Sequence, residues 1–213
     1  MKHVLTITIV VLSTAALIGC IVSDTDHRIY LDPDGGLTWV VLERDVRSVD
    51  GDNIKRQEQE IQFLNEVRGG SHPVAVGFRE LLANSLEYQL LRDARPFSVR
   101  TEANFESAAM VVRRLLSQLG VPAQVDMWIS DNVTTLEAVI MVDEFQEETV
   151  NERVLALVDD PETYQIRLTH GSFIEAKGFV IEEDGALALL ITSYDDDRAE
   201  GEPLVLSLSW IDG

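Results

Sequence analysis

Cysteine and positive charge are scarce in this chain of 213 residues. One Cys is present, which excludes an internal disulfide framework and any zinc site built from several thiolates. The 17 Lys and Arg residues face 37 Asp and Glu residues, a net charge of −20. This imbalance argues against binding to the backbone of DNA or RNA, and against attachment to anionic lipid through a basic face. Hydrophobic residues make up 46% of the chain, enough for a globular domain.

Catalytic and phosphate-binding motifs are also missing. The sequence has no GxSxG, SxxK, GxGxxG or GK[ST] pattern, and no HxH or HExxH spacing. His27, His72 and His170 are far apart in the chain; His72 before Pro73 is explained as a helix-start residue, and His170 before Gly171 as a turn residue. We therefore predict no catalytic residue, no metal ligand and no cofactor, and the balance of these observations is against an enzyme.

Carboxylates are abundant, and they leave two alternatives open. The densest acidic clusters fall at residues 143–148 and 195–202, while Asp32-Pro33-Asp34-Gly35 has only the beginning of a calcium loop. A solvated acidic face is the simplest interpretation of these clusters. The alternatives are an envelope hydrolase that uses paired carboxylates and a protein that binds divalent cations.

The first twenty residues have the layout of a secretory signal. Lys2 gives a basic start, Val4 to Ile18 carry no charge, and small Gly19 precedes Cys20. The segment Leu17-Ile18-Gly19-Cys20 resembles the lipobox of bacterial lipoproteins. The resemblance implies that the Cys20 sulfur receives diacylglycerol, that residues 1–19 are removed, and that the new amino terminus is acylated. The alternative is an uncleaved membrane-spanning helix over Val4 to Val22.

The resemblance to a lipobox implies a location in the cell and a class of function. A lipidated Cys20 holds the mature chain on a membrane of the cell envelope after secretion. The next residue is Ile21 rather than Asp, which by the same resemblance favours the periplasmic side of the outer membrane in a source with two membranes. We expect a lipid-anchored lipoprotein that acts as a non-catalytic interaction or structural module. Its expected partners are the membrane, through the anchor, and a protein of the envelope, with no nucleic acid.

The expected organisation is a signal peptide over residues 1–19, the lipidated Cys and a short tether over 20–27, and a single acidic domain over 28–213. Charge is uneven within the mature chain. Residues 20–121 hold 12 basic and 16 acidic side chains, a balance of −4, whereas residues 122–213 hold 4 basic and 21 acidic ones, a balance of −17. The acidity therefore belongs mainly to the second half.

Local patterns predict hairpins with helices between them. Apolar runs at 28–31 and 37–42 flank a Pro/Asp/Gly turn, and similar pairs occur at 86–91 with 97–103 and at 123–129 with 134–142. Five further strands are expected at 164–169, 173–176, 179–182, 186–193 and 204–211. Trp39, Trp128 and Trp210 all fall in strand-like runs, so we expect them in core or sheet-face packing.

Helical spacing appears in four places. Ile54, Ile61, Leu64 and Val67 recur after a cap at Asp52 or Asn53, with Gly69-Gly70 as the stop. A second helix is expected from Ser71, and its inward side chains are Val74, Phe78, Leu81 and Leu82. A third is expected from a cap at Asn104 to Leu119, and a fourth over residues 147–157. Together these elements predict an α+β fold, mainly an antiparallel sheet of hairpins with three to four helices packed on it.

Overall fold

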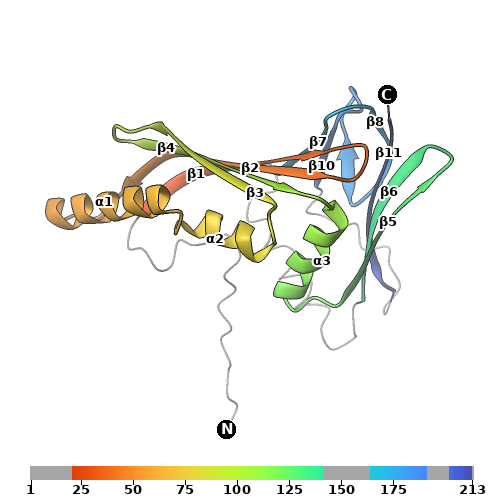
Figure 1. The fold of residues 1–213 in the computed structure, drawn as a ribbon, viewed down its shortest axis with the longest axis horizontal. Helices are drawn as coiled ribbons and strands as arrows, with labels where there is room; N and C mark the ends of the chain where they lie inside the picture. The colour runs from red at the N-terminus through yellow and green to blue at the C-terminus, as the bar shows by residue number, and fades with distance from the viewer. Residues whose placement is uncertain (1–20, 142–163, 191–201, 213) are drawn as a thin grey trace, which may run out of the picture.

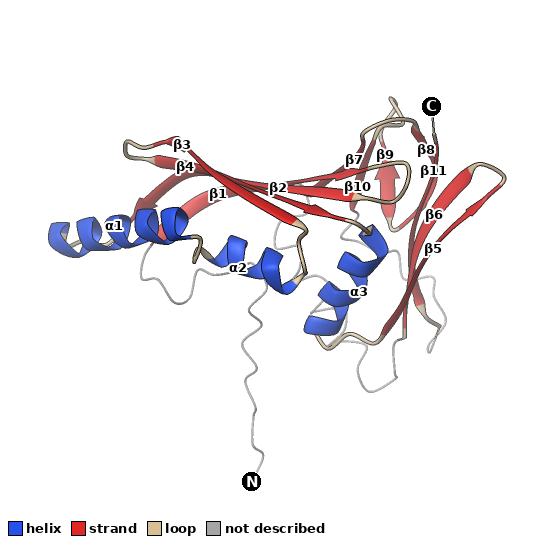
Figure 2. Cartoon of the chain, viewed as in Figure 1, coloured by secondary structure: helices blue, strands red, loops and turns tan. Residues whose placement is uncertain are grey.

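The computed structural model describes residues 21–141, 164–190 and 202–212, and two sheets dominate it (Figure 1). Sheet A has seven strands in the order β3-β4-β2-β1-β7-β10-β9, and sheet B has four in the order β5-β6-β11-β8. Strands make up 51% of the structure. Sheet A forms a long twisted ribbon, and sheet B stands at one end of it (Figure 2).

The centre of sheet A is a long hairpin of β1 (Ile21–Leu31) and β2 (Leu37–Ser48). It pairs from Leu31 with Leu37 beside the turn to Ile21 with Ser48 at the far end. The second predicted hairpin, β3 (Ser85–Arg92) and β4 (Phe97–Phe105), joins it through β4, which pairs antiparallel with β2. Both hairpins confirm the sequence prediction, although the first is much longer than expected.

The second half of the chain completes sheet A on the other side of β1. Strand β7 (Tyr164–Leu168) pairs with β1 in the parallel direction, and β10 (Leu187–Leu190) and β9 (Phe179–Ile181) follow in antiparallel pairing. Strands from distant parts of the sequence therefore share one sheet, with a single parallel pair among the described strands.

Sheet B contains the third predicted hairpin and two strands from the end of the chain. Strand β6 (Val133–Ile140) pairs with β5 (Ala123–Ser130) and β11 (Leu204–Ile211), and β8 (Ser172–Lys177) covers the other side of β11. The chain passes from β7 in sheet A to β8 in sheet B through Gly171, at φ +87°. A Cβ there would lie 1.9 Å from the carbonyl oxygen of Ile211, so this crossing requires glycine.

Helical structure in the described residues consists of one bent helix and one short helix. The bent helix has two segments, α1 (Asn53–Gly69) and α2 (Pro73–Glu80), which lie along one side of sheet A (Figure 1). Asp52 caps α1 through its side chain, and Gly70 at φ 68° ends it, as the sequence predicts. Helix α3 (Ala108–Gln118) packs on β5 and β6.

The predicted fold class is wrong. The sequence predicts one antiparallel sheet carrying three to four helices, whereas the described structure is mostly β, with two sheets and the bent and short helices above. Turn and cap signals are local and locate individual elements, but they do not report which strands pair. The predicted cap at Asn104 is also incorrect, because β4 continues through Phe105 and the Ser107 side chain caps α3. The predicted helix over residues 147–157 lies outside the described residues.

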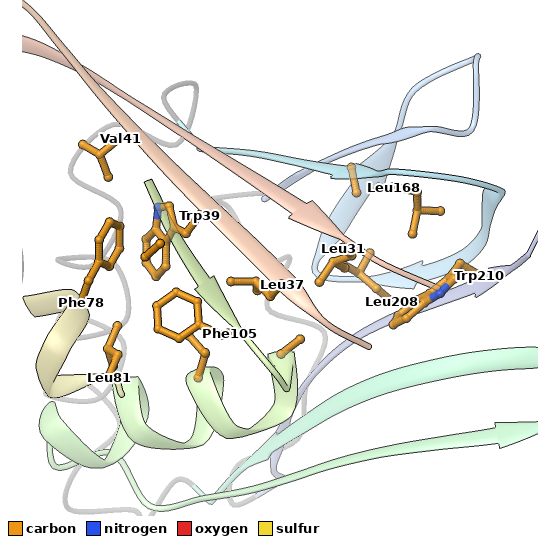
Figure 3. Packing of buried hydrophobic residues seen from close by; sticks show 14 of the residues in the cluster. Leu31, Leu37, Trp39, Val41, Phe78, Leu81, Phe105, Leu168, Leu208 and Trp210 are labelled. Atoms are coloured by element: carbon orange, nitrogen blue, oxygen red, sulfur yellow. The ribbon is translucent and has the colours of Figure 1, made fainter. Parts of the chain in front are cut away.

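One hydrophobic core joins the two sheets. It contains Trp39 of β2, Phe78 of α2, Phe105 of β4 and Trp210 of β11, with Leu31 and Leu168 between the sheets (Figure 3). Phe78 packs against the rings of Trp39 and Phe105 at centroid distances of 5.4 and 5.9 Å. A second cluster lies between α3 and sheet B, and a third beneath the far end of the β1–β2 hairpin. Among the described residues, no helix is both long enough and apolar enough to cross a membrane.

The core position of Phe78 gives a stability prediction. Phe78→Ala should lower the free energy of unfolding by about 3–5 kcal/mol, because it removes a ring that is 1% exposed and leaves a cavity beside Trp39. Val76→Ala, on the same helix but 39% exposed, is the matched control and should cost less than about 1 kcal/mol. Urea unfolding followed by tryptophan fluorescence measures both. Equal losses for the two variants would contradict the assignment of this core.

Candidate functional site

The predicted site residue, Cys20, lies outside the described residues. The described fold begins at the next residue, Ile21, which is already the first residue of β1. Ile21 pairs with Ser48, and it packs against a buried cluster that includes Val46 and Phe63. Residues 21–27, for which the sequence predicts an extended tether, are instead paired strand, because their backbone completes the β1–β2 ladder.

Buried polar groups join this end of sheet A to α1. The Ser48 backbone N–H donates to Glu60 Oε1 at 3.1 Å, and the Ser48 hydroxyl lies 2.5 Å from Gln59 Oε1. Arg95, between β3 and β4, places its Nε 3.0 Å from Glu60 Oε1 and donates through a second nitrogen to the Ser48 carbonyl oxygen at 3.2 Å. The carboxylate of Glu60, which is 9% exposed, therefore has a charged partner and an amide donor.

A second buried pair lies nearby, where β2 meets the bend between α1 and α2. Glu43 Oε2 lies 3.5 Å from His72 Nε2, and the two residues are 8% and 7% exposed. The ring of Phe63 meets the imidazole edge-on at a centroid distance of 5.3 Å. Within the described part of the chain, neither Glu43 Oε2 nor His72 Nδ1 has a hydrogen-bond partner. The pair is therefore only partly satisfied by the described side chains.

Burial favours the uncharged forms of both groups. It raises the pKa of Glu43 to about 7 and lowers the pKa of His72 to about 4. Between these values a protonated carboxyl group faces a neutral imidazole, rather than a carboxylate facing an imidazolium. Such a pair can exchange one proton, but its burial separates it from any molecule in solution. Its effect is therefore on the stability of the fold.

His27 has a structural role in the core. The indole N–H of Trp39 donates to His27 Nδ1 at 3.1 Å, and the two rings meet edge-on at 5.8 Å. An acceptor nitrogen must be unprotonated, which agrees with the burial that lowers the pKa of His27 to about 4. His170, by contrast, is exposed in the turn after β7. The three histidines thus occupy three different environments.

The structure gives the candidate ion ligands local roles where it describes them. Asp32 accepts from the Thr169 hydroxyl at 2.8 Å, and Asp34 accepts from the backbone N–H of Gly36 at 3.1 Å. Within the described ranges, no three His, Cys, Asp or Glu side chains come together as a ligand set. The acidic clusters at 143–148 and 195–201 lie outside those ranges.

The tryptophans divide between core and surface. Trp39 and Trp210 are 3% and 0% exposed, which confirms the expectation of core packing. Trp128 is 43% exposed on β5, an edge strand of sheet B. The three indoles therefore do not form a shared exposed face.

Sequence reasoning missed Glu43, although a signal was present. Leu37, Trp39 and Val41 alternate along β2 and are all buried, and Glu43 is the next residue in the same register. A carboxylate at an inward strand position marks a buried ionisable group. Its partner His72 comes from the α1–α2 bend, which no spacing in the sequence links to β2.

Comparisons with known proteins give no family for the chain. No family model matches it, and no curated protein matches it. Among solved structures, the chain is similar to the folded domain of the Mycobacterium tuberculosis LppM protein, determined by NMR, with 11% identity over 91% of each chain. The TM-score is 0.36, which does not establish a shared fold.

The Glu43 environment predicts a pH dependence of stability. Between about pH 4.5 and 7 the folded state keeps a proton on Glu43 that the unfolded chain has released, so this group lowers stability as pH rises. His27 and His72 act in the opposite direction between about pH 4 and 6.5, because there the unfolded chain binds protons that the folded state lacks.

Glu43→Gln should remove the contribution of Glu43 to the pH dependence and leave the contributions of His27 and His72 in place. Relative to wild type, its free energy of unfolding should rise by about 3 kcal/mol between pH 4.5 and 7.5, at about 1.4 kcal/mol for each unit of the pKa difference. Urea midpoints at the two pH values measure the change. Glu58→Gln, on the exposed side of α1, controls for the loss of one negative charge. Parallel pH profiles for Glu43→Gln and wild type would rule out a raised pKa at this position.

Proposed function

We propose that this protein is a lipid-anchored lipoprotein of the cell envelope, and that its folded part is a non-catalytic interaction or structural module. The observation that carries the proposal is the lipobox-like segment Leu17-Ile18-Gly19-Cys20, which contains the one cysteine of the chain. A thiol kept for catalysis has no reason to fall at the end of an apolar signal.

A lipid anchor of this kind is enough by itself to keep a protein on a membrane. Each acyl chain contributes about 0.8 kcal/mol for every buried CH₂ group, so one chain binds reversibly and two or more hold firmly. The lipobox class carries three chains on its modified cysteine. The proposed address is therefore a membrane of the envelope, on the outer-membrane side where the source has two membranes.

The burial of ionisable groups supports a module rather than a hydrolase. A general acid or base must reach the substrate within hydrogen-bonding distance, directly or through one water. Glu43, His72 and His27, the groups whose pKa values are most shifted by burial, are all less than a tenth exposed. Among the contacts that the structure describes, His27 accepts from Trp39, and Glu43 faces His72 beside Phe63.

The anchor is tested by substitution of Cys20. In wild-type protein expressed in a bacterium, intact-mass measurement should show loss of residues 1–19 and the added mass of diacylglycerol and an acyl chain. Cys20→Ala should retain residues 1–19 and carry no lipid mass, because the acceptor sulfur is gone. Ser23→Ala, an exposed position three residues further on, is the control and should be processed like wild type. A wild-type protein without acyl mass would end the proposal.

The interaction role predicts a stable partner. Protein extracted from native membranes in mild detergent should elute with a second protein at fixed stoichiometry, and chemical cross-linking before extraction should trap the same pair. A chain that elutes as a free monomer at native abundance, with no cross-linked product, would contradict an interaction module. It would leave the lipid anchor unaffected.

A further inference from the structure

Helix α1 exposes two isoleucines on the side turned away from the protein. Its buried side chains are Glu60, Phe63 and Val67, which face the end of sheet A. Ile54 and Ile61 are 70% and 52% exposed. At 100° per residue these two isoleucines are centred about 140° around the helix from the buried side chains, and they are seven residues, or about two turns, apart. The sequence predicts them as part of an inward stripe, and the structure places them outward.

This surface is at the end of the molecule where the anchor joins. Cys20 precedes Ile21, which pairs with Ser48, and the Ser48 N–H donates to Glu60 of α1 at 3.1 Å. Consecutive Cα atoms are about 3.8 Å apart, paired strand residues about 5 Å apart, and a helix with its side chains is about 10–12 Å wide. Ile61 follows Glu60, so its side chain lies within about 20 Å of Cys20 by this route. Sheet B lies at the opposite end (Figure 2).

We propose that the outer face of α1, defined by Ile54, Glu58, Ile61 and Asn65, rests on the surface of the bilayer that holds the lipid anchor. The proposal rests on lipidation of Cys20, and adds to it a second contact and an orientation. The anchor brings the domain to the membrane, and the two isoleucines enter the interface between headgroups and acyl chains. The domain then lies with α1 between the membrane and one end of sheet A, and with sheet B at the opposite end.

The missing tether favours lipid over a protein as the occupant of this face. With β1 paired from Ile21 onward, no free linker separates the lipidated residue from the fold. Charge favours the same orientation, because residues 20–121 have a balance of −4 and residues 122–213 a balance of −17. Anionic headgroups repel the second half more strongly. Exposed Lys55 and Arg68, near the two ends of α1, offer cationic contacts to headgroup phosphates.

Site-directed labelling of the lipidated protein tests this orientation. Because the anchor consumes the thiol of Cys20, the variant Ile61→Cys carries one reactive cysteine for an environment-sensitive fluorophore. The matched control is Ile129→Cys, on β5 of sheet B, where the isoleucine is 69% exposed. Both proteins, with acyl mass verified, are reconstituted in phosphatidylcholine vesicles with and without a phospholipid that carries a nitroxide quencher on its acyl chain.

The expected result is a blue shift and at least twofold stronger nitroxide quenching at position 61 than at position 129. Ile54→Cys should behave like Ile61→Cys. Equal quenching at positions 61 and 129 in protein of verified acyl mass would overturn the orientation and leave the anchor intact. Shielding at position 61 without quenching by lipid would show that a protein, such as a second copy, covers the face, and would also overturn it. Absence of acyl mass would remove both the anchor and this inference.

Discussion

The backbone pairing of β1 with β2 is the constraint on which the other elements depend. The two strands are direct neighbours in the sheet, and their pairing extends from Leu31 with Leu37 at the turn to Ile21 with Ser48 at the far end. Near the turn, the hairpin presents Leu31, Leu37 and Trp39 to the core shared with sheet B. At the far end it provides Val46 and Ser48 to α1. One hairpin thus fixes the distance between the two ends of the molecule.

The two ends use different kinds of interaction. Around the turn the contacts are apolar and aromatic, including the Phe173 and Trp210 pair of sheet B at a centroid distance of 6.4 Å. At the α1 end, buried Glu43 and Glu60 accompany the apolar cluster of Val46, Phe63 and Val67. Glu60 has Arg95 and the Ser48 amide as partners, whereas Glu43 has a neutral His72. Buried polar groups specify position more than they add stability, because an alternative packing leaves them unpaired.

The sequence locates most elements because their signals are local. Asp52 and Gly70 delimit α1, and the turn residues place the three hairpins within a few positions. It does not predict the parallel pairing of β1 with β7, because no local pattern links Ile29 to Ile166. Separation into two sheets is equally invisible, since it depends on a crossing at Gly171 whose tight contact is with Ile211.

The orientation of α1 shows why apolar periodicity can mislead. Ile54 and Ile61 fit a helical stripe, and a helix in water is expected to bury such a stripe. Here Glu60 takes an inward position, because Arg95 and Ser48 supply the partners that make its burial tolerable. Those partners come from the β3–β4 connection and the end of β2, so only the folded chain reveals them. Glu43 differs, because the alternation of buried residues along β2 is enough to predict from the sequence that its side chain points inward.

The absence of slack between Cys20 and β1 has a mechanical consequence for an anchored protein. A flexible linker lets a domain tumble at a distance from its membrane, so that the surface of the domain contacts water rather than lipid. A strand paired from its first residue transmits the position of the anchor directly to the sheet. Under the proposed lipidation of Cys20, the outer side of the helix bound to that end of the sheet lies next to lipid headgroups. In the proposed orientation, the exposed isoleucines of α1, two turns apart on an outer side that is otherwise polar, supply the apolar contact with that lipid.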